Sequence, residues 1–153
     1  MTSAVFDNFP VKYLTGLVNI QANSTSTFCV LGTTAPTKAS WATYNDIKWA
    51  ASSPYEIAVV NGYALGGSGI ATAVPTVNAA VVGIKSTGAT VFTTNSTITA
   101  SMSIAQYAAS SSTTTSNPLM GYLDIGAQSV TNGTLTLTWN AAGIFTMTVG
   151  AAG

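Results

Sequence analysis

The side chains that could catalyse a reaction are few and scattered along this sequence. The chain has no histidine, and its four carboxylates are Asp7, Asp46, Glu56 and Asp124. Without histidine, a Ser-His-Asp or Cys-His arrangement cannot be assembled, and the commonest zinc ligand is missing. Two of the carboxylates could meet in the fold as a glycosidase pair, but no residues suited to tuning their pKa values surround them. We therefore predict that the protein is not an enzyme.

One glycine-rich string resembles a nucleophile motif, but its spacing is different. In Gly66-Gly67-Ser68-Gly69 the serine is followed directly by glycine, whereas a nucleophile elbow reads Gly-x-Ser-x-Gly. The string also lacks the lysine of a phosphate-binding loop, so we predict a bend that glycine permits. The single Cys29 excludes an intrachain disulfide and a multi-cysteine metal site. We expect Cys29 to be buried, and we expect no metal and no cofactor.

Charged residues are unusually rare in this chain of 153 residues. They make up 5% of the sequence, against about 25% in typical globular domains. Four dispersed lysines form no basic patch, which argues against nucleic acid as a partner. No apolar run is long enough for a transmembrane helix, and the first residues lack the pattern of a signal peptide. Since a surface of low net charge favours association, we predict a protein held in an assembly, with no membrane partner.

Two stretches of the sequence alternate between apolar and hydroxyl side chains. In residues 98–104 every second position is apolar and the positions between them are threonine or serine. Residues 134–139 alternate threonine with leucine and tryptophan. This period of two predicts strands with one face on the core and the other face outward. The outward face carries hydroxyls, which cost less to desolvate than charges, so it suits contact with a neighbouring protein.

Short apolar segments separated by turn residues predict an all-β protein. We predict an antiparallel β-sandwich or jelly-roll-like fold with one or two short helices near the N-terminus. Residues 1–10 are expected to form an extended N-terminal arm, and residues 11–153 a single β-rich domain. The predicted elements are a helix over 12–18, with Tyr13, Leu14, Leu17 and Val18 on one side, a helical turn capped by Ser40, and further strands at 27–32, 55–60, 77–84, 90–93, 119–125 and 144–149.

Five aromatic residues in the N-terminal third have alternative interpretations. Trp41, Tyr44 and Trp49 cluster in a segment with little periodicity, while Phe6 and Phe9 are the large apolar groups of the predicted arm. One interpretation is that the cluster covers an end of the core. Another is that all five residues anchor a subunit interface, where aromatic side chains are enriched. A third is that Trp41, Tyr44 and Trp49 form an exposed platform for stacking on sugars.

The C-terminal half resembles a group of small virion proteins of tailed bacteriophages. The likeness lies in residues 62–67 (Gly-Tyr-Ala-Leu-Gly-Gly), in 117–126 (Asn-Pro-Leu-Met-Gly-Tyr-Leu-Asp-Ile-Gly) and in 130–144 (Val-Thr-Asn-Gly-Thr-Leu-Thr-Leu-Thr-Trp-Asn-Ala-Ala-Gly-Ile). In that group the corresponding order is a Pro-Leu-Ile-x-Tyr-x-Asp-Phe-Gly strand, an Asn-Gly turn and a Trp-x-x-x-Gly-Ile ending. The likeness covers residues 62–148 and is loose before them. This chain lacks the acidic residues that usually decorate such proteins.

The resemblance implies a capsid cement or decoration protein. Such a protein would bind across major capsid subunits on the exterior of the virion, associate with copies of itself, and be assembled in the host cytoplasm. Two alternatives are a neck, tail or fibre subunit of the particle and a carbohydrate-binding β-sandwich module. The resemblance brings no catalytic motif.

Overall fold

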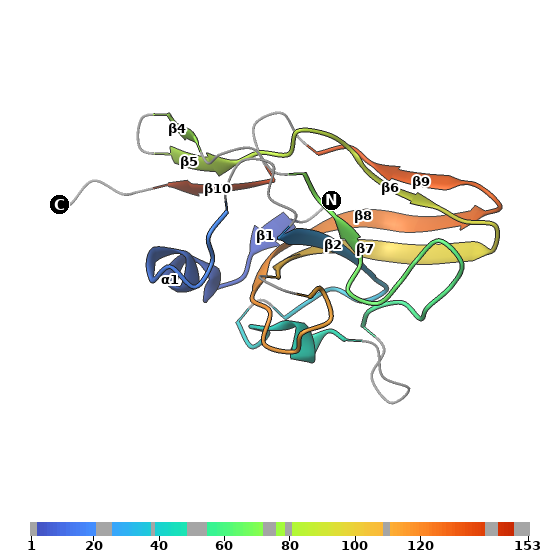
Figure 1. Cartoon of the computed structure of the whole chain (residues 1–153), viewed down its shortest axis with the longest axis horizontal. Helices are drawn as coiled ribbons and strands as arrows, with labels where there is room; N and C mark the ends of the chain where they lie inside the picture. The colour runs from blue at the N-terminus through green and yellow to red at the C-terminus, as the bar shows by residue number, and fades with distance from the viewer. Residues whose placement is uncertain are drawn as a thin grey trace.

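A five-stranded antiparallel sheet is the largest element of the protein (Figure 1). The computed structural model describes residues 3–20, 26–37, 39–48, 55–71, 76–78, 81–108, 111–139 and 144–148. The sheet has the strand order β1-β8-β7-β2-β3, and every neighbouring pair is antiparallel. Its strands are β1 (Ser3–Val5), β2 (Thr27–Gly32), β3 (Ser68–Gly69), β7 (Thr97–Tyr107) and β8 (Leu119–Thr131).

Two smaller sheets lie over one side of the large sheet, in the upper part of Figure 1. One has three strands in the order β10-β5-β4, and the other is a ribbon of β6 and β9. These strands are β4 (Thr76–Asn78), β5 (Val81–Ile84), β6 (Thr90–Thr93), β9 (Thr134–Leu137) and β10 (Phe145–Thr148). The fold is therefore all-β, antiparallel and sandwich-like with one short helix near the N-terminus, as the sequence predicts.

The strand predictions agree well with the structure. β2 and β6 have the predicted bounds, the alternating segment 98–104 falls in β7, and the first four residues of the segment 134–139 form β9. Apolar positions of these two segments are buried, among them Ile98, Ile104 and Leu135. The predicted strand 77–84 is divided into β4 and β5, while β8 continues six residues beyond the predicted end at residue 125. A register shift near Gly126, where φ is +69°, interrupts the β7–β8 pairing within that longer strand.

The N-terminal residues belong to the body of the fold. β1 is extended, as predicted for an arm, but it pairs with β8 of the same chain. The helix α1 (Phe9–Leu14) begins three residues before the predicted start. Pro10 lies in its first turn, where the missing N–H has no helical partner to lose. No described helix is long enough to cross a membrane.

The segment between β2 and β3 contains two further differences from prediction. The helical turn is η1 (Tyr44–Asp46), and it is capped by Thr43 and Asp46 in a reciprocal capping box, not by Ser40. Residues 55–60 are not a strand. They run beside the end of β2, where Thr33 N–H donates to Tyr55 O and Ile57 N–H donates to Leu31 O, and Gly32 forms an isolated bridge with Glu56.

Candidate interaction surfaces

Threonine and serine side chains pair across the outer face of β7 and β8. The hydroxyls of Thr97 and Thr131 lie 2.8 Å apart, and those of Thr99 and Ser129 lie 3.3 Å apart. All four residues are exposed, while Ile98 between the two threonines is buried. The alternation of the strand therefore turns one face to the core and presents paired hydroxyls on the other.

The ribbon of β6 and β9 has an outer face of the same kind. Thr93 and Thr134 are directly opposite each other, with their hydroxyls 3.3 Å apart. Phe92 and Leu135, one position along each strand, are buried. We call the exposed hydroxyl residues of β6–β9 and β7–β8, with Thr138 directly after β9, the hydroxyl surface; they are Thr93, Thr97, Thr99, Ser129, Thr131, Thr134, Thr136 and Thr138.

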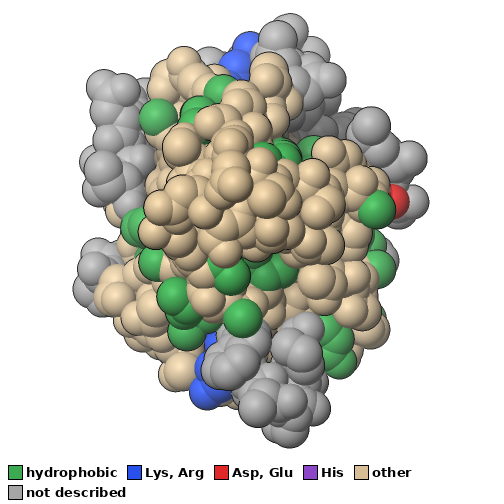
Figure 2. All heavy atoms as spheres, turned by 90° about the vertical axis from the view of Figure 1, so that its right-hand side faces the viewer, with side chains coloured by type: hydrophobic (Ala, Val, Ile, Leu, Met, Phe, Trp, Pro, Cys, Tyr) green, Lys and Arg blue, Asp and Glu red, His purple; other side chains and the backbone are tan. Residues whose placement is uncertain are grey.

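Few of the described side chains at the end of the molecule that carries these strands are charged. Figure 2 shows this end, where β6 leads into β7 and β8 leads into β9. Most of the described surface in this view consists of backbone and of side chains that are neither hydrophobic nor charged, and the few charged side chains lie near the top, the bottom and the right edge. The two turns lie side by side here, because Asn132 N–H donates to Ser96 O and Thr94 N–H donates to Gly133 O.

One carboxylate, Glu56, is completely buried inside the fold. Tyr44 Oη donates to Glu56 Oε2 at 2.6 Å, while Tyr63 Oη and Gly66 N–H donate to Oε1 at 2.8 and 2.7 Å. Leu31 N–H of β2 donates in turn to Tyr63 Oη at 3.2 Å. We call Glu56, Tyr44, Tyr63 and Gly66 the Glu56 node. The Glu56 side chain joins η1 to the segment 63–66, and the Tyr63 hydroxyl joins that segment to β2.

The surroundings of the Glu56 node suit a structural role. Burial and the adjacent Glu56 carboxylate raise the pKa of both phenols, Tyr44 and Tyr63, above the ordinary tyrosine value. Gln106 supports the same region, since its Nε2 donates to Gly66 O at 3.0 Å and to Ser112 O at 2.7 Å. The carboxylate is thus held by neutral donors away from solvent, where a substrate has no access to it.

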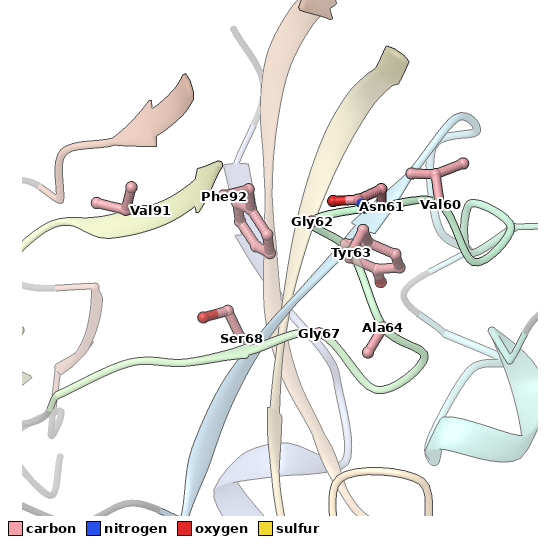
Figure 3. Close-up of a pocket in the computed structure, with 9 residues that line it drawn as sticks. All are labelled: Val60, Asn61, Gly62, Tyr63, Ala64, Gly67, Ser68, Val91 and Phe92. Atoms are coloured by element: carbon pink, nitrogen blue, oxygen red, sulfur yellow. The ribbon is translucent and has the colours of Figure 1, made fainter. Parts of the chain in front are cut away.

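A shallow groove of about 500 Å³ lies beside the node (Figure 3). The rings of Tyr63 and Phe92 line it with their centroids 5.7 Å apart, and Ser68 and Val91 belong to the same lining. Its lining contains no charged residue. Among the described residues, no group of three or more histidine, cysteine, aspartate or glutamate side chains could hold a metal ion.

Cys29 is buried in β2, as predicted. Its Sγ lies 3.1 Å from Ser103 Oγ on β7. Burial raises the pKa of the thiol to about 12, and the hydrogen bond to Ser103 opposes this shift only in part. The thiol therefore stays protonated and behaves as a small apolar side chain.

The five aromatic residues predicted for an interface do not form one exposed cluster. Phe6 and Phe9 are fully buried in the core of their own chain, and Tyr44 is buried with its hydroxyl on Glu56. Trp41 is half-buried, with its ring edge-on to Tyr55 at a centroid distance of 4.3 Å. Trp49 lies outside the described residues. Of the three interpretations, a role in covering the core agrees best with Tyr44 and Trp41, and Tyr44 has no face left for stacking on a sugar.

Sequence reasoning missed an exposed aliphatic group at α1. Val11, Leu14 and Leu17 are 63%, 82% and 66% exposed, and we call them the α1 stripe. The predicted helix placed Leu14 and Leu17 on one side with Val18, yet Val18 is buried. The helix ends at Leu14, and Gly16 then adopts a φ of +76°, so the chain turns before Val18. The available signal was Gly16, which lies inside the Leu14-Thr15-Gly16-Leu17 spacing.

Comparisons with known proteins add no family to this description. No protein-family model matches the sequence, and neither a curated protein nor a solved structure is significantly similar to it.

Proposed function

We propose that the protein is a structural subunit of a virion, of the capsid cement or decoration type, and that it acts through contact area without catalysis. The observation that carries the proposal is the hydroxyl surface. Six of its hydroxyls are already paired with one another across the strands, at 2.8–3.3 Å. A neighbouring protein can cover such a surface without leaving these groups unpaired, so the desolvation penalty is small.

The likeness to small phage virion proteins supports the more specific part of the proposal. It covers residues 62–148, which include both strand pairs of the hydroxyl surface. With 5% charged residues, copies of the chain repel other proteins only weakly, which favours association. The hydroxyl surface and the low charge both favour binding over a broad, uncharged area.

The direct test is the protein content of purified phage particles. Quantitative mass spectrometry of particles from the phage that encodes this chain should find it in hundreds of copies. A dozen copies or fewer would assign it to a neck, tail or fibre, and its absence would refute a virion role.

A binding experiment tests the hydroxyl surface itself. Thr131→Lys together with Thr134→Lys would bury unpaired ammonium groups under the neighbour, and we expect binding to expanded, cement-free shells to weaken at least about tenfold. Thr113→Lys is the matched control, because Thr113 is an exposed threonine outside this surface. Equal binding of the two variants in co-sedimentation would contradict the assignment.

A further inference from the structure

The α1 stripe is an apolar surface that remains exposed in the described part of the chain. Five large hydrophobic residues are exposed among the described residues, and Val11, Leu14 and Leu17 are three of them. Val11 and Leu14 are separated by three positions, so they lie one turn apart on the same side of the helix. Isolated exposed aliphatics are ordinary on a protein surface, whereas a group of them marks a contact site.

The α1 stripe lies on a helix that is fixed to the rest of the fold. Phe9 at the start of α1 is fully buried, and Lys12 Nζ donates to Ala42 O at 2.9 Å. The helix closes with the two bonds of a Schellman motif, from Gly16 N–H to Tyr13 O at 3.2 Å and from Leu17 N–H to Lys12 O at 3.0 Å. A partner that covers Leu14 and Leu17 therefore has little backbone left to order, which favours binding.

The charge around the stripe identifies the kind of partner. Between residues 8 and 19 the only charged side chain is Lys12, and its ammonium is turned to Ala42 O and toward Asp46. A two-fold contact places the same patch on both sides, so a charge near the axis within the patch would face a like charge. The α1 stripe avoids that repulsion. A helix that binds lipid instead carries lysine and arginine along its polar side.

We propose that the α1 stripe is the apolar centre of a two-fold contact between two copies of this chain. Stable interfaces bury roughly 800 Å² on each partner, and three aliphatic side chains supply only part of such an area. The polar residues around them form the rim, and the dimer is expected to dissociate on dilution. The contact between two copies does not require a capsid, so it can be tested independently of the proposed function.

Sedimentation velocity of the full chain, from micromolar to millimolar concentration, tests the contact. The wild type should shift from monomer to dimer, and the variant with Leu14→Ser and Leu17→Ser should dissociate at least about tenfold more readily. Val59→Ser is the matched control, since Val59 is equally exposed, at 63%, outside the stripe. Near-ultraviolet circular dichroism should show the same fold for all three proteins, because these side chains lie on the surface.

A cross-link provides a second measurement. Leu14→Cys should form a disulfide between two copies under mild oxidation, and Val59→Cys should not; the buried Cys29 does not compete. A wild type that stays monomeric throughout, or a serine variant that dimerises as the wild type does, would overturn the proposal. Binding of a monomeric wild type to neutral phosphatidylcholine vesicles would overturn it too and assign the stripe to lipid.

Discussion

The Glu56 node and the α1 stripe reverse the usual distribution of polarity. Glu56 is a carboxylate with no exposed surface, while Leu14 is an aliphatic side chain that is 82% exposed. Tyr44, Tyr63 and Gly66 donate hydrogen bonds to the carboxylate. Among the described residues, no comparable set of contacts covers Leu14. The carboxylate is satisfied by hydrogen bonds within its own chain, whereas Leu14 remains exposed to solvent.

The difference separates what holds this fold together from what the fold offers to partners. A buried charge is tolerated only when hydrogen bonds replace its water, so every part of the node depends on the others. An exposed aliphatic residue contributes little to the stability of the folded monomer. Changes in the node should therefore alter the free energy of unfolding, and changes in the stripe should alter association.

Glu56→Ala should give the largest loss of stability. The substitution leaves the hydroxyls of Tyr44 and Tyr63 and the N–H of Gly66 without their acceptor. Each orphaned buried donor costs about 1–3 kcal/mol, and partial relaxation should leave a total of about 3–5 kcal/mol. Urea denaturation followed by circular dichroism would measure it.

Glu56→Gln is the control that keeps the shape of the side chain. Its amide oxygen can still accept from Tyr63 and Gly66, and its NH2 group can donate to the Tyr44 oxygen. We expect it to lose less than half as much as Glu56→Ala. If Glu56→Ala unfolded at the same urea concentration as the wild type, the node would not be a source of stability.

A matched pair of glycines compares the two regions directly. Gly66 in the node and Gly16 after α1 both have positive φ, +84° and +76°. A Cβ at Gly66 would lie 2.5 Å from Ser112 Oγ and 2.7 Å from the Ser112 carbonyl carbon, whereas a Cβ at Gly16 meets nothing within 4 Å. Gly16→Ala should cost about 1–2 kcal/mol for the backbone conformation alone. Gly66→Ala should cost about 1–3 kcal/mol more because the packing must also move.

Thermal unfolding of both glycine variants would measure this difference. If both variants lost the same amount of stability, the loop around Ser112 would be able to move without an energetic penalty. The node would then be no more constrained than the end of α1.

The sequence predicted the strands well because their signal is local. Period-two alternation and flanking turn residues located β2, β6, β7 and β9, since the alternation itself records which face is buried. The outward hydroxyls of the hydroxyl surface follow from the same pattern. The hydrogen bonds between Thr97 and Thr131 do not, because their partner strand has to be known.

The Glu56 node and the α1 stripe were not visible in the sequence for a different reason. Glu56 has no charged neighbour along the chain, and its donors come from positions 7 to 12 residues away that only the loop conformation brings together. The stripe depends on where α1 ends. The prediction continued the helix through Gly16, which placed Leu14 and Leu17 beside the buried Val18.

Alkaline pH should weaken the node by the smallest of these effects. The pKa values of Tyr44 and Tyr63 are raised in the folded protein by burial and by Glu56, and Cys29 adds to the shift at Tyr63. The unfolded chain then releases its phenolic protons first, near pH 10. Stability is therefore fully present below about pH 10 and falls as the pH rises further.

Tyr63→Phe separates this titration from a general alkaline effect. Near neutral pH it should cost about 1–2 kcal/mol, because Glu56 loses a donor and Leu31 N–H loses its acceptor. Tyr44→Phe removes one bond and should cost less. Above pH 10 either variant has one phenol fewer to ionise, so its stability should fall less steeply than that of the wild type. Parallel urea midpoints across the pH series would show instead that neither buried tyrosine is coupled to folding.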